Sequence, residues 1–509
     1  MANLRMRKSI DEVSFLNQTA LTLQKKFVSL KPTHFAVQKS IFNTLLQKML
    51  GLVNGEIFTL HTTEPIAVRS LLERLKHTGL VSRYGEGPLY SDYPKFNYVG
   101  IYHTVQKNDR YDTSHTAWGY SFLEDSSELA FSKALGELVE RHASYHLPHS
   151  KSVTYPILKH GDASFLYPYI PKFTAHQKPR NKNFVASASD MQNMLGFRAK
   201  SLTGDRKRFL PFEAFYWGPY SHNEQKIFAH PTTSGSGGGK TISEATLSAL
   251  GELIERDHFL LYWLSGIKPK RLKNNAVPGS FGEYIRLCEQ NYDLEIHFLD
   301  TSHDIAVVSG VCVIIDPVLN LIAMGSKVGT DGMTVLKGAY LEAMAVLTSI
   351  RKQNKAFPEH KLKEVLTHKV FTSPVGHTDR LNLYSSRYGI DLVRKHFLGG
   401  ESLSFEQFSK DNQVFSSEEE KLVYLVKEIN ALVEQHGPGY HAYIHIFESR
   451  WLAELKYHAV HVFIPQFLKL YLSENFAAPL SDRLTEFGKK HGKSIISEKN
   501  LNPLPHFFP

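Results

Sequence analysis

Two eight-residue segments of this chain are nearly identical, and they constrain its fold more than any other feature. Ala134-Leu-Gly-Glu-Leu-Val-Glu-Arg141 and Ala249-Leu-Gly-Glu-Leu-Ile-Glu-Arg256 differ only by valine for isoleucine and lie 115 positions apart. Residues three positions apart share one face of a helix, so each segment predicts a helix with two carboxylates on one side. Where two such helices meet, the oxygen-rich lining suits Mg2+, which often accompanies a nucleoside triphosphate. The duplication therefore predicts a nucleotide site built from glutamates.

A third carboxylate extends the second segment. Glu244 precedes Glu252 by eight positions, close to two helical turns, so Glu244, Glu252 and Glu255 fall along one stripe. Clustered carboxylates repel one another unless a cation lies between them, although Arg141 and Arg256 each relieve part of that repulsion. Two solvated helix faces with internal ion pairs are the plainer alternative.

Composition limits the class of protein. The 509 residues can bury a large core and form more than one domain, and they carry a formal net charge of +9. Basic residues are spread along the chain without interleaved aromatic residues, which favours a solvated surface over a nucleic-acid interface. No apolar run is long enough for a membrane helix, and the N-terminus has no apolar signal core. With only Cys288 and Cys312 present, a reducing cytoplasm fits best.

The order of patterns predicts two units. Residues 1–92 are predicted to form a small helical domain that resembles a winged helix, with a helical extension lacking a binding role as the alternative. From residue 93 to 509 strands and helices alternate, which predicts an α/β domain. Its strand candidates are 305–315, 321–324 and 459–464, and its helix candidates are 127–145, 243–263 and 336–354. The polar stretches 171–190 and 354–380 are predicted to be loops.

One local motif offers a competing nucleotide site. Ser234-Gly-Ser-Gly-Gly-Gly-Lys-Thr241 comes close to the phosphate-binding loop, in which backbone amides and a lysine, here Lys240, hold the phosphates. Its first position is Ser234 rather than glycine, and the preceding residues make a poor end for the buried strand that feeds such a loop. The glutamate site explains more residues at once.

The motifs resemble the YcaO family. The first block is present as Gly119-Tyr-Ser121, Glu128-Leu-Ala130 and Lys133 to Arg141, and the second as Gly239 to Ala245 followed by Leu250 to Asp257. Later steps of the family pattern resemble Gly338-Ala-Tyr-Leu-Glu-Ala343 and Val460-His-Val-Phe-Ile-Pro465. The resemblance spans about residues 95 to 509. Two departures are Lys133, where relatives often have serine, and Leu247, where some relatives are acidic.

The resemblance implies ATP and Mg2+ as cofactors, without a phosphate loop. By position, it implies Mg2+ ligands at Glu137, Glu140, Glu244, Glu252 and Glu255. It also places Arg256, and in a less defined position Arg351, against ATP. The number of Mg2+ ions stays open.

The C-terminus supplies a second cue. Azoline-forming members end in a proline-rich tail that enters the active site, and Pro505-His-Phe507-Phe-Pro509 resembles that tail with phenylalanine at the middle position. A stiff apolar terminus favours docking over disorder. The resemblance then implies a cyclodehydratase that converts Cys, Ser or Thr of a ribosomal precursor peptide into thiazoline or (methyl)oxazoline rings. The Pro509 carboxylate and His506 are the candidates for organising proton removal.

Several alternatives stay open at this point. Residues 1–92 are too short for a whole partner resembling the ubiquitin-activating enzyme, so we expect a separate leader-binding protein of that kind, unless residues 1–92 bind the leader peptide or the partner directly. The alternative functions are a thioamide- or amidine-forming member of the family, an unrelated phosphate-loop ATPase that uses Lys240, and a non-catalytic scaffold. The peptide substrate and the oligomeric state, a homodimer among them, are not fixed by the sequence.

Overall fold

The computed structural model of the chain describes most of it from residue 71 onward. The described residues are 71–73, 75–76, 81–87, 89–107, 110–145, 159–204, 207–217, 226–230, 232–273, 276–353, 371, 375–495 and 498–508. The helical unit predicted for residues 1–92 therefore lies largely outside them, and so do Pro509 and most of the predicted loop 354–380.

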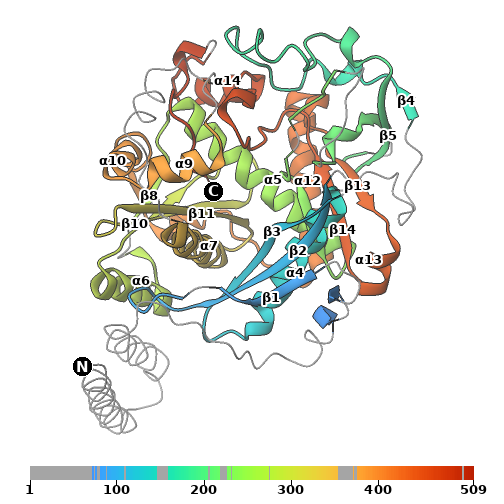
Figure 1. The fold of residues 1–509 in the computed structure, drawn as a ribbon. Helices are drawn as coiled ribbons and strands as arrows, with labels where there is room; N and C mark the ends of the chain where they lie inside the picture. Colours follow the sequence, from blue (N-terminus) through green and yellow to red (C-terminus); the bar gives the residue numbers. More distant parts are fainter. Residues whose placement is uncertain are drawn as a thin grey trace, which may run out of the picture.

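The described strands form three mainly antiparallel sheets (Figure 1). The first contains β1 (Val81–Glu86), β2 (Asn97–Lys107) and β3 (Arg110–Ser121), in that order. The second has the order β11 (Leu321–Gly329), β10 (Val308–Asp316), β9 (Glu295–Asp300), β8 (Lys270–Leu272) and β12 (Ser402–Leu403). The third has the order β4 (Lys159–Gly161), β5 (Met194–Ser201), β13 (Tyr443–Phe447), β14 (His458–Phe463) and β7 (Ser236–Gly239), and β6 (Arg208–Pro211) pairs with β5.

Three long helices lie between the sheets, and the other described helices pack around them. The long helices are α4 (Ser127–Tyr145), α5 (Ile242–Ser265) and α7 (Gly332–Gln353). The others are α6 (Gly279–Tyr292), α9 (His377–Tyr384), α10 (Arg387–His396), α11 (Phe405–Phe408), α12 (Glu418–His436), α13 (Arg450–Leu455) and α14 (Asp482–Lys490).

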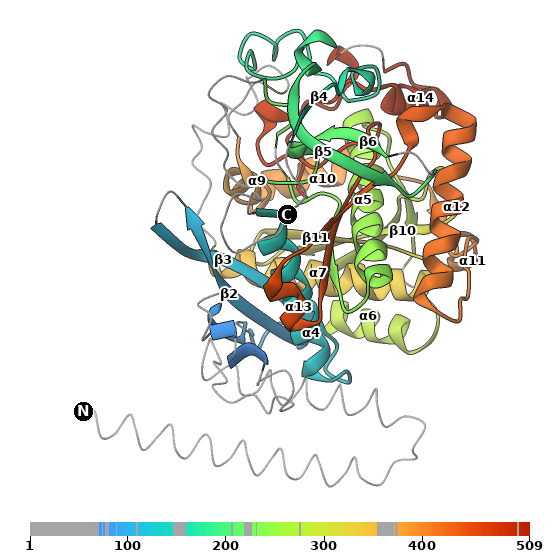
Figure 2. The same ribbon diagram turned by 90° about the vertical axis from the view of Figure 1, so that its right-hand side faces the viewer.

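The long helices connect the sheets in a ring. Helix α4 packs on β3 of its own sheet and on β7 of the third sheet; α5 packs on β7 and on β11; α7 packs on β11 and on β3. Figures 1 and 2 show α5 passing through the middle of the molecule, with helices α4 and α7 near it. Each helix is thus shared by two sheets, and the three helices meet at the centre.

Close helix-to-strand packing explains the glycines of these strands. A Cβ atom on Gly119, Gly237 or Gly325 would come within 1.8–2.4 Å of the carbonyl oxygen of an alanine on the facing helix. The alanines are Ala130 on α4, Ala245 on α5 and Ala339 on α7, and in each helix a second alanine follows four positions later. Glycine and alanine therefore let all three strand–helix pairs approach at the same short distance.

The sequence predicted the elements around the duplicated segments well. Helix α4 has the predicted bounds, and α5 and α7 differ from theirs by at most four residues at either end. Thr241 caps α5 by accepting the Glu244 N–H at 3.0 Å, and Gly266 ends the helix with φ 64°. The three predicted strands correspond to β10, β11 and β14.

Helix α7 has the length and apolar composition of a membrane-spanning helix. It packs on β11 and β10, however, and 61% of its apolar 18-residue window is buried inside the protein. These contacts are those of a core helix in a folded domain.

The C-terminal segment lies in the interior, as the tail prediction expected. Leu504, Phe507 and Phe508 are at most 7% exposed, and the Phe507 ring lies 5.2 Å from that of Trp263 on α5. The Trp263 indole donates a hydrogen bond to the Leu504 carbonyl oxygen at 3.1 Å, and the Tyr384 hydroxyl of α9 donates to that of Pro505. Figure 1 shows this end of the chain beside α5 and α9.

Candidate functional site

The first glutamates of the two duplicated segments occupy matching positions. Glu137 of α4 accepts the N–H of Trp118 on β3 and pairs with Arg141 one turn later. Glu252 of α5 accepts the N–H of Gly235, which precedes β7, at 2.9 Å, and pairs with Arg256 at 2.7 Å. Both carboxylates are about one quarter exposed, so each is reachable from outside while held by its own sheet.

Two more glutamates reach the second sheet. Glu255 of α5 accepts the N–H of Val328 at 3.1 Å and lies 3.3 Å from the Lys327 ammonium. Glu342 of α7 accepts the N–H of Ser326 at 2.8 Å. All these donors lie on β11, so α5 and α7 both direct carboxylates to the same strand.

Carboxylates from all three helices lie around one partly buried phenol. Burial raises the pKa of Tyr120 on β3 well above 10, and the negative charges of Glu342, Glu137 and Glu255 raise it further. These three glutamates belong to α7, α4 and α5. The predicted meeting of the two duplicated helices is therefore present, and it includes a third helix.

The cluster concentrates negative charge in a desolvated place. Burial raises the pKa of Glu140 well above its usual range, and repulsion from Glu252 and Glu137 adds to the shift. Burial and then the Glu255 charge raise the pKa of Glu342 to about 8. Carboxylates with raised pKa values lack compensating positive charge, so the cluster has the electrostatics of a cation site.

The donor set fits Mg2+ bound together with a phosphate ligand. In the described part of the chain, no three carboxylate, histidine or cysteine side chains lie close enough to form a closed metal cage. Mg2+ usually keeps several waters and is held by one or two carboxylates plus substrate phosphates. Carboxylates spread over three helices, each already positioned by a backbone N–H, match that arrangement.

Arg256 provides a cation at the edge of the cluster. Its guanidinium donates to the Ser234 hydroxyl at 2.9 Å while it pairs with Glu252, and its side chain is 15% exposed. Two hydrogen-bonding partners fix its orientation, which suits an arginine that contacts phosphate.

The other predicted site residues lie elsewhere. Glu244 is exposed at the first turn of α5, where it accepts the Lys240 N–H at 2.7 Å. Arg351 pairs with Asp92 at 2.6 Å and lies over the rings of Tyr90 and Tyr93. Their roles toward metal and ATP stay predictions, since local contacts account for both positions.

Of the two tail residues predicted to organise proton removal, the structure describes only His506. His506 is fully buried, and its Nε2 lies 3.0 Å from the Tyr471 carbonyl oxygen. This contact fixes the tail, whereas Pro509 lies beyond the described residues. Proton removal by either group stays a prediction.

The glycine-rich segment does not form a phosphate loop. Ser236–Gly239 is strand β7, which pairs with β14, and Thr241 directly caps α5. The Lys240 side chain is exposed and follows the strand. The backbone therefore lacks the loop between strand and helix that cradles phosphates.

Two residues of the cluster were missing from the predicted set. Glu342 belongs to the block 338–343 that was recognised in the sequence, and its alanine neighbours repeat the spacing of the other two helices. Lys327 carries no such signal, because a lysine at the end of an apolar strand usually marks its solvent-exposed end.

Comparisons with known proteins agree with this geometry. The family model described as YcaO cyclodehydratase, ATP- and Mg2+-binding, matches residues 124–468. A heterocyclase in complex with substrate and cofactor has a similar structure, with 16% identity and a TM-score of 0.64 over 91% of this chain and 60% of that chain. This chain thus spans less than two thirds of that protein. No curated protein sequence matches.

Two further structures are similar over nearly their whole length. One is YcaO from Methanopyrus kandleri bound with AMPPCP and Mg2+, with 14% identity and a TM-score of 0.55 over 82% of this chain and 95% of that chain. The other is the E. coli microcin synthetase McbBCD complex with pro-MccB17 bound, with 12% identity and a TM-score of 0.50 over 83% and 96%. They confirm the predicted α/β fold, and the family description confirms ATP and Mg2+ as the cofactors.

Proposed function

The chain belongs to the YcaO cyclodehydratase family, and we propose that it converts Cys, Ser or Thr residues of a ribosomal precursor peptide into thiazoline or (methyl)oxazoline rings with ATP and Mg2+. The observation that carries this proposal is that α4, α5 and α7 pack on shared strands, whose backbone N–H groups hold glutamates of all three helices. The docked C-terminal segment supports ring formation over the other chemistries of the family.

Ring formation removes one water from the peptide. The side-chain sulfur or oxygen bonds to the preceding carbonyl carbon, the nucleophile and the amide nitrogen each lose a proton, and the carbonyl oxygen leaves. An amide oxygen is a very poor leaving group. Mg-ATP, when bound, supplies the phosphoryl group that lets it depart as phosphate.

The residues of the chain contribute position and charge. Glu137, Glu140, Glu252, Glu255 and Glu342 would hold Mg2+, and Glu244 keeps its place as a predicted ligand at the start of α5. Arg256 and Lys327 lie on the same cluster and offset negative charge on phosphate oxygens. Phosphoryl transfer depends mainly on alignment and cations, so fixed side chains of this kind supply most of what it needs.

The tail supplies the candidate base. His506 binds the Tyr471 carbonyl oxygen, so we assign it to holding the tail. The carboxylate of Pro509, three residues further on, is the group assigned to proton removal. Trp263 and Tyr384 anchor the described part of the tail at Leu504 and Pro505.

The substrate enters with help from another protein in this proposal. McbBCD is described as a complex with a bound pro-peptide, and the heterocyclase is described with substrate. We assign leader recognition to a separate protein resembling the ubiquitin-activating enzyme, in the cytoplasm. Vigorous leader-dependent turnover by this chain alone would contradict that assignment.

Mass spectrometry of the peptide product tests the function. The chain is incubated with Mg-ATP and a Cys-containing precursor peptide encoded next to its gene, with and without the neighbouring leader-binding protein. A loss of one water per modified residue supports cyclodehydration, and a gain in mass from oxygen-to-sulfur exchange supports thioamide formation instead. Glu252→Gln is the matched control. If the peptide stays unmodified and the chain does not bind Mg-ATP, the chain is a non-catalytic scaffold.

A further inference from the structure

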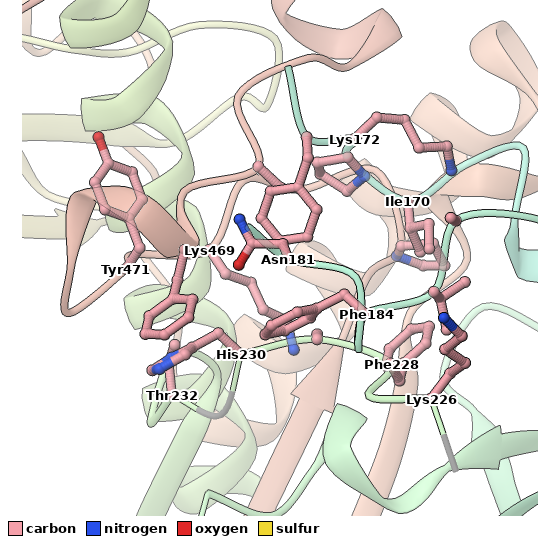
Figure 3. Close-up of a pocket in the computed structure, with 18 of the residues that line it drawn as sticks. Ile170, Lys172, Asn181, Phe184, Lys226, Phe228, His230, Thr232, Lys469 and Tyr471 are labelled. Atoms are coloured by element: carbon pink, nitrogen blue, oxygen red, sulfur yellow. The ribbon is translucent and has the colours of Figure 1, made fainter. Parts of the chain in front are cut away.

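A cavity of about 520 Å3 lies between residues 167–186 and the chain around and after the end of β14. Figure 3 shows its lining, in which lysine side chains surround aromatic rings. The aromatic residues of the lining are Tyr167, Phe173, Phe184, Phe228, Phe463, Phe467, Tyr471 and Phe476. Its size is typical of a ligand pocket, which spans ~300–1,000 Å3.

Two residues that line the cavity contact neighbours of the proposed active site. At one end it is lined by Thr232, whose hydroxyl accepts the N–H of Ser234, the residue that Arg256 contacts. At another point it is lined by Tyr471, whose carbonyl oxygen holds His506 of the tail. A molecule in the cavity would therefore be separated from Arg256 by Thr232 and Ser234, and from the tail by Tyr471.

Positive charge in the cavity is unbalanced. Five of the residues that line it are lysines: Lys172, Lys178, Lys182, Lys226 and Lys469. No aspartate or glutamate is among the described lining residues, and none of the five ammonium groups lies within 4.0 Å of a carboxylate in the described chain. An anionic occupant would satisfy these charges.

The interior surface is aromatic. The Phe184 ring packs edge-on to Phe173 at 5.2 Å, and the His230 ring stacks on Phe476 at 4.3 Å. The Lys469 ammonium lies 4.6 Å from the centre of the Phe463 ring. Packed rings of this kind offer a flat apolar surface to a large side chain.

We propose that this cavity binds an acidic segment of the substrate peptide that carries an aromatic or other large apolar side chain next to the residue being cyclised. The inference rests on the proposed function and deepens it, since it names the sequence class of the peptide. Lys172, Lys226 and Lys469 donate to backbone carbonyl oxygens, but no carboxylate of the described chain balances the charge of the five lysines. A nucleotide base would use the rings and leave that charge unbalanced, whereas an acidic peptide uses both.

Isothermal titration with two unlabelled hexapeptides tests the proposal. One is acetyl-Asp-Glu-Phe-Cys-Gly-Glu-amide, and the other replaces the acidic residues with Asn and Gln. The full chain is compared with the double variant Lys178→Glu, Lys226→Glu and with the control double variant Lys395→Glu, Lys427→Glu, whose exposed lysines lie on α10 and α12 away from the cavity. Mg-ATP is titrated into each protein as well.

We expect the acidic peptide to bind about tenfold more tightly than the neutral one, and the cavity variant alone to lose this preference. Mg-ATP affinity stays the same in all three proteins, which also shows that the variants fold. Equal affinity for the two peptides overturns the proposal. So does a cavity variant that loses Mg-ATP instead, because the cavity then belongs to the nucleotide. Failure of the unmodified chain to bind Mg-ATP refutes the proposed function, whichever peptide it prefers.

Discussion

The carboxylate of Glu252 and the guanidinium of Arg256 lie 2.7 Å apart on one face of α5. The pair is separated by one helical turn, and each member has a second partner, the Gly235 N–H for Glu252 and the Ser234 hydroxyl for Arg256. One contact therefore positions a predicted metal ligand and a predicted phosphate ligand together.

This pairing predicts the effect of Glu252→Gln. The substitution keeps the shape but removes the charge that attracts Mg2+ and orients Arg256, so we expect Mg-ATP affinity to fall ~10–100-fold in isothermal titration. Lys240→Ala is the control and leaves the affinity unchanged, because that lysine is exposed beyond β7. Loss of binding in Lys240→Ala with normal binding in Glu252→Gln contradicts the glutamate site.

Two glycines of the duplicated region differ in the space around them. A Cβ on Gly237 would lie 2.2 Å from the Ala245 carbonyl oxygen, whereas a Cβ on Gly251 meets nothing within 4 Å. We expect Gly237→Ala to lower the free energy of unfolding by ~3 kcal/mol through forced separation of β7 and α5. Gly251→Ala, within a helix, raises it by ~0.5–1 kcal/mol. Urea unfolding of the two variants checks the difference in sign.

Tail docking predicts a large cost for Phe507→Ala. The ring is 5% exposed and packs on Trp263 and Phe397, so its removal leaves a cavity, and we expect ~3–5 kcal/mol of destabilisation. The control is Val414→Ala, at a side chain that is 99% exposed, with no measurable change. Thermal unfolding that is the same for the two variants would show that the tail does not pack as described.

The partly buried ammonium of Lys469 predicts a pH dependence of peptide binding. Burial lowers its pKa to about 7, so the free protein carries little charge there above that pH. An acidic peptide favours the charged form and raises the pKa in the complex, so binding takes up a proton. Affinity for the acidic hexapeptide should therefore fall as pH rises from 7 to 9.

Lys469→Met serves as the comparison for that profile. The variant removes this titrating group but keeps an apolar stem against Phe463, so its affinity should fall less over the same pH range. The remaining fall comes from Lys172, which lines the same cavity and whose pKa burial lowers to about 8. If the affinity of the variant and that of the unmodified protein changed with pH in parallel, this ammonium would have no role in binding the peptide.

The sequence predicted the helices that carry the site and left out what depends on three-dimensional assembly. Duplicated Glu-x-x-Glu-Arg spacing located α4 and α5, because helical periodicity fixes which face a carboxylate occupies. The position of Glu342 relative to Glu255 follows from the pairing of α7 with β11, which no local pattern encodes. The cavity lysines are dispersed from residue 172 to 469, and only the fold brings them together.

The ring of helices shared between sheets has a consequence for folding. The cluster exists only once distant parts of the chain have met at the centre. Its backbone donors range from Trp118 to Val328, and its carboxylates range from Glu137 to Glu342. Contacts that join such distant parts of the chain form slowly, because a long loop has to close before they gain anything. The glutamates are therefore expected to come together among the last events of the folding reaction, and loss of any one of the three strand–helix pairs would leave the cluster incomplete.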